Sequence, residues 1–208
     1  MAEQGLSGIL IPEEYGGSNF GLSGIGVVLQ ELGRTLTPSP LFATAVLGAS
    51  LISKLGTDEQ KKKYLPEIAN GTLTCCFAFE EGPRHNPKVS EVTAEKKGEK
   101  FLINGKKCFV VDGGFADLII IAAKSSKSTS LFLAQKDSKG IEVKEAKMVD
   151  SRNSANILFT DLEINSENVL GEIDNAQDTI EEVLDIARAA ISAEMLGGAL
   201  EAFEITIN

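Results

Sequence analysis

The stretch Leu73-Thr74-Cys75-Cys76-Phe77-Ala78-Phe79 marks the point at which the spacing of apolar residues changes. Before it, apolar residues recur every three or four positions, which predicts helices with one buried face. After it, short alternating or continuous apolar runs are separated by turn residues, which predicts strands. The chain therefore divides near residue 72 into a helical part and a β part.

The helical part is predicted to hold three helices, over about 22–36, 41–55 and 57–70. The segment Thr37-Pro38-Ser39-Pro40 separates the first two, because proline cannot donate to the helix ladder. Thr57 with Gln60 three positions later is a capping-box pattern, which predicts the start of the third helix.

The β part is predicted to form an antiparallel barrel or sandwich, because it holds many short strands at close spacing. Lys97-Gly98-Glu99 is predicted as a turn, and Asn104-Gly105 as a hairpin turn, since both of its positions tolerate a positive φ. The continuous apolar run 118–123 is predicted as a central strand. The other expected strands lie over 73–79, 89–95, 101–103, 108–111, 131–134, 141–143 and 157–164.

A helical period returns at about residue 176 and continues to 206. A long helix that buries one face needs a partner surface, so we expect either truncation or a partner chain. The expected fold class is α+β. It consists of an N-terminal helical segment (1–71), a middle antiparallel β-barrel domain (72–174) and the first long helix of a truncated C-terminal helical domain (175–208).

Composition excludes several classes of function. The 208 residues carry 20 Lys+Arg and 30 Asp+Glu, a net charge of −10, whereas nucleic-acid binding needs clustered Lys and Arg. No apolar run reaches the roughly 18–20 residues that span a bilayer, and we find no signal-peptide pattern. Three cysteines form no disulfide framework, so we expect a reduced, cytoplasmic protein. No spacing of metal ligands and no phosphate-binding loop occurs.

Five segments occur in the order, and near the spacings, of the acyl-CoA dehydrogenase family, which the chain resembles over essentially its whole length. The resemblance implies FAD-dependent α,β-dehydrogenation of an acyl-CoA thioester. It also implies that FAD binds between the β and C-terminal domains. Electron-transfer flavoprotein or a similar protein would accept the electrons, and the protein would form a homo- or hetero-oligomer. The segments are Gly8 to Gly17, Leu55 to Pro66, Asn104 to Lys107, Gly113 to Asp117 and Phe159 to Gly171.

The same resemblance implies which residues meet the flavin. Phe77 and Phe79 are expected at the edge of the ring, and Phe109 keeps an aromatic face for stacking. Glu80 replaces a family threonine whose hydroxyl and backbone amide meet the flavin pyrimidine. Val111 replaces a family threonine whose hydroxyl addresses flavin N5.

On the long helix, Asp185 and Arg188 resemble a family Asp-x-x-Arg pattern, in which the acidic residue meets the CoA arm and the arginine lies by the active site. They lie one helical turn apart, so an intrahelical ion pair is the alternative. Some family members carry the proton-abstracting carboxylate just before this arginine, where this chain has Ile186 and Ala187. Glu194 is interpreted as structural, so no catalytic residue is assigned to the chain.

Two other functions stay open. The departures at Glu80 and Val111 fit a non-catalytic partner subunit of a heteromeric acyl-CoA dehydrogenase with a degenerate flavin site. A flavin-dependent monooxygenase that uses external reduced flavin on the same scaffold is the second. His85, in the loop Gly82 to Pro87, is predicted to lie at the surface, and Cys75 and Cys76 are predicted as buried thiols.

Overall fold

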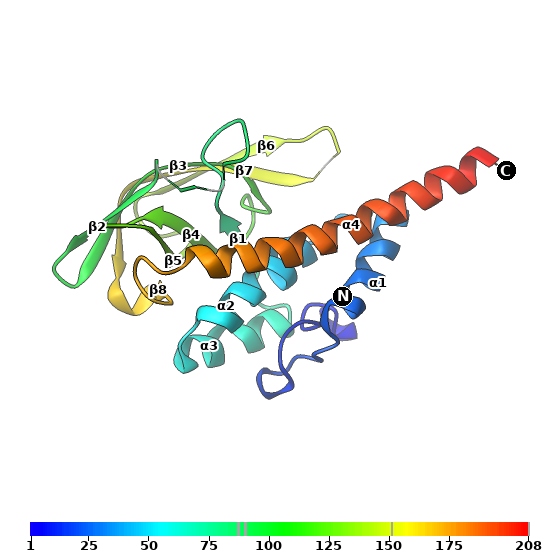
Figure 1. Cartoon of the computed structure of the whole chain (residues 1–208), viewed down its shortest axis with the longest axis horizontal. Helices are drawn as coiled ribbons and strands as arrows, with labels where there is room; N and C mark the ends of the chain where they lie inside the picture. Colours follow the sequence, from blue (N-terminus) through cyan, green and yellow to red (C-terminus); the bar gives the residue numbers. More distant parts are fainter. Residues whose placement is uncertain (87, 90, 151, 208) are drawn as a thin grey trace.

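The fold consists of a helical layer packed against a twisted β-sheet, with one long helix running beneath the sheet (Figure 1). The computed structural model describes residues 1–86, 88–89, 91–150 and 152–207. The predicted loop 82–87 and the predicted strand 89–95 each include one residue, Pro87 and Ser90, that lies outside this set. These two predictions are therefore tested only in part.

The three helices predicted before residue 72 are confirmed. The second begins as a π-helix and continues as an α-helix, whereas Thr57 and Gln60 form the predicted capping box with bonds of 3.2 and 3.1 Å. The elements are the 3-10 turns η1 (Ala2–Gln4) and η2 (Glu13–Tyr15), then α1 (Gly21–Arg34), η3 (Leu41–Gly48), α2 (Ala49–Leu55) and α3 (Asp58–Ala69).

The middle of the chain forms one sheet, whose strands follow the order β6-β7-β3-β2-β4-β5-β8, with β1 paired to β4. It differs from the expected antiparallel barrel in two ways. β1 and β2 pair with β4 in parallel, and no pairing among the described residues joins the two edge strands, β6 and β8. The strands are β1 (Cys75–Ala78), β2 (Thr93–Lys97), β3 (Lys100–Val111), β4 (Leu118–Lys124), β5 (Thr129–Gln135), β6 (Ile141–Lys147), β7 (Asn153–Asn165) and β8 (Val169–Leu170), with a 3-10 turn, η4 (Ser166–Asn168), before β8.

The hairpin turn predicted at Asn104-Gly105 is wrong, because β3 runs through it as one long strand. Gly105 has a φ of 131° at a shift in the register between β3 and β7. A Cβ atom on Gly105 would lie 2.8 Å from Val92 Cα, so the glycine serves a close approach of two strands inside the sheet. The other predicted turn, Lys97-Gly98-Glu99, does join β2 to β3.

The central strands supply two separate cores with alternate residues. Phe77 on β1 and Ile120 on β4 face the helices, whereas Cys76 and Ile119 face the interior of the curved sheet. Both faces of β1 and β4 are therefore buried, which explains why β4 reads as a continuous apolar run.

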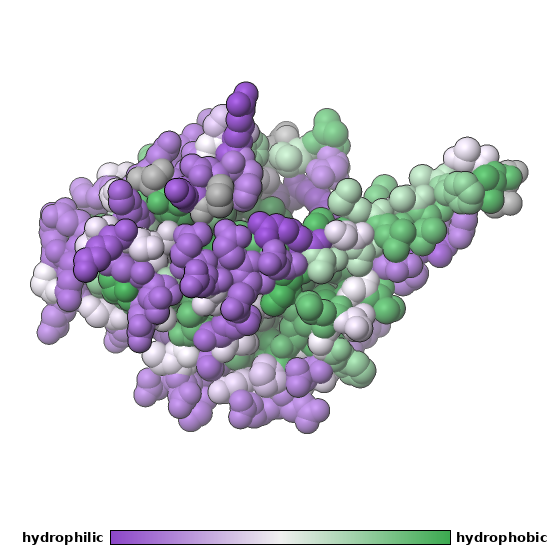
Figure 2. All heavy atoms as spheres, viewed as in Figure 1, coloured by the Kyte–Doolittle hydropathy of each residue, from purple (hydrophilic) through white to green (hydrophobic). Residues whose placement is uncertain are grey.

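The predicted long helix is confirmed as α4 (Gln177–Ile207). It packs against α1 through glycines: a Cβ on Gly33 would lie 2.0 Å from Glu194 O, and one on Gly197 would lie 1.8 Å from Gln30 O. Its last turns carry exposed apolar side chains, seen as the green end in Figure 2. No helix in the described residues is long and apolar enough to cross a membrane.

Asp174 joins the β4–β5 loop to the segment that leads into α4. Its Oδ1 accepts hydrogen bonds from Ser125 Oγ (2.5 Å), Lys127 N (2.9 Å) and Ser128 N (2.7 Å), and its Oδ2 accepts one from Ser126 Oγ (2.6 Å). These donors hold the pKa of the Asp174 carboxyl below its usual range against the opposing effect of burial. The carboxylate is therefore the anchor of the N-terminal end of α4.

We predict that Asp174→Ala lowers the free energy of unfolding by about 1–3 kcal/mol, because the amides of Lys127 and Ser128 lose their acceptor. Since the pKa is lower in the folded state, the stabilisation is full above the ordinary Asp range and declines as the pH falls through the folded-state pKa. Urea unfolding at pH 7 and pH 3 measures both effects. Asp137→Asn, an exposed carboxylate change, is the control; an equal loss in both variants would contradict the role of Asp174.

Candidate functional site

Phe109 is the most conspicuous of the predicted flavin residues. It has a φ of 50°, it is 52% exposed, and it lies at a register shift between Lys107 and Val110, where the pairing of β3 with β7 is interrupted. A positive φ is costly for an aromatic residue, and such strain concentrates at functional positions. The aromatic face is therefore presented to solvent at a break in the sheet.

Phe77 and Phe79 lie at the end of β1 and just beyond it, and both are buried on the side of the helices. Their rings stack with centroids 5.4 Å apart and an interplanar angle of 27°. Packing of this kind fixes the direction in which the chain leaves β1. Their place at a flavin edge stays a prediction.

Glu80 follows directly and pairs with a residue of the next loop. Its Oε1 lies 2.5 Å from His85 Nδ1, while its buried Oε2 has no partner among the described residues. The His85 side chain is 55% exposed, in agreement with the surface position that was predicted. The Glu80 carboxylate, which stands where the resemblance expects a threonine, therefore has His85 beside it.

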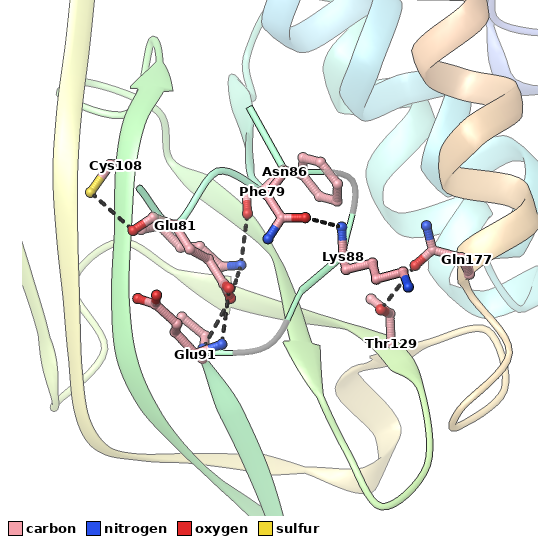
Figure 3. Close-up of polar contacts among 10 residues, drawn as sticks. Phe79, Glu81, Asn86, Lys88, Glu91, Cys108, Thr129 and Gln177 are labelled. Carbon is pink, nitrogen blue, oxygen red and sulfur yellow. Dashed lines mark hydrogen bonds and ion pairs between the residues drawn. The ribbon is translucent and has the colours of Figure 1, made fainter. Parts of the chain in front are cut away.

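A buried ion pair holds this strand end against β3. The ammonium of Lys107 is fully buried and donates to Phe79 O at 2.8 Å and to Glu81 Oε1 at 2.9 Å. The Glu81 carboxylate also accepts from the backbone N–H groups of Glu91 (2.9 Å) and Val92 (3.0 Å), and Figure 3 shows it between the two ends of the loop. Burial lowers the pKa of Lys107 to about 8, although Glu81 opposes this shift. We call this Lys107–Glu81 ion pair the clamp. It fixes both ends of the segment that carries Glu80 and His85.

Val111 lies apart from this cluster, in the wall of a cavity of about 200 Å³ between the helical layer, the end of β3 and α4. The apolar part of the wall comes from α1 and from the segment that follows it. The polar part comes from Asp112, Arg152 and Glu194.

The three charged groups of this cavity come from three different elements. Glu194 on α4 is 8% exposed and pairs with Arg152, which precedes β7. Asp112 is 7% exposed and has a φ of 59° at the end of β3. Burial raises the pKa of Asp112 to about 6, although Arg152 opposes this shift. A buried carboxyl and an ion pair thus face one small chamber.

Asp185 and Arg188, the predicted substrate residues, form an ion pair with each other on the exposed side of α4, and Arg188 also lies 3.7 Å from Glu181. In the part of the chain that the structure describes, no hydrogen bond or ion pair joins them to the predicted flavin residues. The intrahelical ion pair, which was the alternative to substrate binding, is therefore present in the structure. Contact of Asp185 and Arg188 with CoA stays a prediction.

The structure therefore brings together Phe77, Phe79, Glu80 and Phe109, because Cys108 N donates to Glu80 O at 2.7 Å beside the Lys107 clamp. Sequence reasoning did not identify the clamp or the charged cavity. For Glu194 a signal existed: it falls at the helical spacing of the buried residues Ile180, Val183, Ala187 and Ala190, so a carboxylate stands on the buried face.

Comparison with known proteins assigns the class. Residues 1–72 match the N-terminal domain of acyl-CoA dehydrogenases, and residues 76–165 match their middle domain. The chain belongs to the acyl-CoA dehydrogenase family, whose members are oxidoreductases.

Individual relatives agree with this assignment. The chain is 31% identical to cyclohex-1-ene-1-carbonyl-CoA dehydrogenase of Geobacter metallireducens, over 100% of the chain and 58% of the relative. It is 29% identical to acryloyl-CoA reductase (NADH) of Anaerotignum propionicum, over 100% of the chain and 56% of the relative. The structure of a glutaryl-CoA dehydrogenase from Mycobacterium smegmatis in complex with FADH2 shares the fold, with a TM-score of 0.92, 23% identity and coverage of 99% and 54%. The chain thus spans between half and three fifths of the length of these proteins.

We predict that Lys107→Met destabilises the fold by about 3–5 kcal/mol, because it leaves the buried Glu81 carboxylate without its cation. Urea unfolding of the variant measures this loss. Lys106→Met, at the exposed neighbouring position of β3, is the matched control and should change stability by less than about 0.5 kcal/mol. Similar values for the two lysines would show that burial of Lys107 does not matter.

Proposed function

We propose that this chain forms the N-terminal helical and β portion of an FAD-dependent acyl-CoA dehydrogenase, which introduces an α,β double bond into an acyl-CoA thioester. Membership of the family supports the reaction class, and relatives named as dehydrogenase and reductase both act on CoA thioesters by their names. FAD, when bound, would supply the acceptor for the β hydrogen.

The observation that carries the proposal is the exposed ring of Phe109. An aromatic residue held at a positive φ, beside a strand end fixed by a buried ion pair, is a rigid flat surface against which an isoalloxazine ring could stack. In this role Phe109 would orient the ring, and the clamp between Lys107 and Glu81 would keep the loop at its edge in place.

The residues near the expected pyrimidine edge fit a flavin less well. A carboxylate about 4 Å from the charge of a reduced flavin would oppose it by on the order of 4 kcal/mol at an effective dielectric constant of 20. Because His85 Nδ1 lies 2.5 Å from Glu80 Oε1, a protonated His85 would offset this charge. The fit to FAD therefore depends on the Glu80–His85 pair.

We assign no carboxylate of this chain as the group that removes the α proton. That proton acceptor would lie in residues other than 1–208. The electron acceptor would be electron-transfer flavoprotein or a similar protein. The exposed apolar turns at the end of α4 would be covered in a homo- or hetero-oligomer or by further helices. The free thiols of Cys75, Cys76 and Cys108 support the proposed cytoplasmic location.

One observation favours a second candidate, a non-catalytic partner subunit of a heteromeric dehydrogenase. The buried Glu80 Oε2 without a partner among the described residues is unfavourable next to an anionic ligand. In that case the fold would be kept for assembly after the flavin site had decayed.

We predict that Phe109→Ala weakens FAD binding by this chain about 5- to 150-fold, because a base-sized aromatic contact is worth about 1–3 kcal/mol. Quenching of FAD fluorescence during titration measures the affinity. Phe20→Ala removes a 72% exposed phenylalanine from the start of α1 and should leave the affinity unchanged. Equal affinities of Phe109→Ala and the parent would contradict stacking on Phe109.

We predict that Glu80→Thr raises the affinity for FAD, because the carboxylate that opposes the flavin is removed and a hydroxyl donor is supplied. The same fluorescence titration measures the affinity of the variant for FAD. A weaker affinity would mean that Glu80 does not face the ring. Absence of FAD binding by both proteins would favour the partner-subunit function.

A further inference from the structure

Asparagine is followed by glycine at two positions of the chain, and the structure gives the two pairs opposite surroundings. Asn70-Gly71 ends α3 ahead of β1, and both residues are exposed. Asn104-Gly105 lies inside β3. In such a pair the backbone nitrogen of the second residue can attack the side-chain carbonyl carbon of asparagine, and glycine obstructs the attack least because it has no Cβ atom. The chain therefore contains its own matched comparison for this reaction.

The Asn104 side chain is held in the sheet at both of its polar atoms. Its amide nitrogen donates to Asp161 Oδ1 at 3.2 Å, and its oxygen accepts from Asp161 N at 2.8 Å. Gly105 is paired with Phe159 of β7. Attack by the Gly105 nitrogen would require β3 to separate from β7, and the central strands of a sheet open least often.

The Asn70 side chain makes no hydrogen bond within the described residues. Gly71 has a φ of 73°, and its N–H donates to Ile68 O at 3.0 Å, while Thr72 N donates to Glu67 O at 2.9 Å. These two bonds close only the last turn of α3, and helix ends fray. Release of one turn is therefore enough to free the Gly71 nitrogen, with the rest of the fold intact.

We propose that Asn70 is a site of spontaneous deamidation in the folded protein. The Gly71 nitrogen loses its proton to a solvent base and forms a bond to Asn70 Cγ, and the side-chain nitrogen leaves as ammonia after taking a proton from water. Water then opens the resulting five-membered succinimide at either carbonyl, which gives aspartate or isoaspartate. One amide and one water molecule become one carboxylate and one ammonium ion, without any change of oxidation state.

The products would weaken the junction between α3 and β1. A carboxylate at the C-terminal end of α3 opposes the helix dipole. Isoaspartate also inserts a methylene group into the main chain beside Gly71, where space is short: a Cβ atom on Gly71 would lie 2.4 Å from Ala2 Cβ. We therefore expect the aged protein to unfold at a lower urea concentration than the fresh protein. The reaction requires no flavin and is independent of the proposed dehydrogenation.

The test incubates the 208-residue protein at pH 8 and 37 °C and digests samples with trypsin. The tryptic peptides 64–84 and 101–106 contain Asn70 and Asn104, respectively, as their only asparagine. Mass spectrometry measures the replacement of NH by O in each peptide, and a zero-time sample corrects for reaction during digestion. In the folded protein, peptide 64–84 should react about ten-fold faster than peptide 101–106 or more, since a fraying helix end opens more readily than a central strand. In concentrated urea the two rates should converge, because unfolding frees both pairs. Protein isoaspartyl methyltransferase should label peptide 64–84 of the folded, aged protein.

Two variants connect the chemistry to the loss of stability. Asn70→Gln requires a six-membered ring for the same attack, so its urea midpoint should stay constant during incubation while that of the parent falls. Asn86→Gln is the matched control: Asn86 is exposed, but it precedes proline, which has no N–H to react, so this variant should age as the parent does. Equal rates for the two peptides of the folded protein, or an unmodified peptide 64–84 under conditions where it reacts in urea, would overturn the proposal. So would an equal fall in the urea midpoint of Asn70→Gln and the parent.

Discussion

Burial of β1 and β4 on both faces is the constraint on which the rest of the structure depends. The side chains that face the helices belong to one core, and their neighbours in sequence belong to the other. A slip of one residue in either strand would exchange the two sets, so the register of β1 against β4 is fixed from both sides. The end of β1 is consequently one of the best-defined points of the chain, and Phe79 to Glu81 leave it in a fixed direction.

The buried ammonium of Lys107, on β3, bonds to this strand end and so holds β3 in place beside β1. Lys107 reaches Phe79 O and Glu81 across the gap between the strands, and two residues later the chain turns to a positive φ at Phe109. Asp112 repeats the left-handed conformation three residues further on. Each such residue costs on the order of 1–3 kcal/mol and persists only where its surroundings enforce it. The clamp and the two cores supply that enforcement, so the irregular end of β3 is a consequence of the regular structure around it.

Much of this architecture could be predicted from the sequence because it depends on local patterns. The capping box of Thr57 and Gln60, the apolar run of β4 and the period of α4 each lie within one element. Asn104-Gly105 misled the prediction, because the same residues that suit a hairpin turn also suit a bulge, and only the approach of Val92 from β2 decides between them. The charged cavity was beyond prediction for a related reason: Asp112, Arg152 and Glu194 are far apart in sequence and meet only when α4 packs beneath the sheet.

The distribution of buried charge separates folding from function in this chain. Lys107 faces Glu81, Arg152 faces Glu194, and Glu80 faces His85, so each of these carboxylates has a neighbour that can neutralise it. Pairing of this kind lets a charge be buried without further explanation. Asp112 shares the cavity with Arg152, which opposes the effect of burial on its pKa, but Arg152 is already paired with Glu194. Asp112 immediately follows Val111, the last residue expected to meet a flavin, so the least compensated carboxylate of this cavity lies beside the expected flavin position.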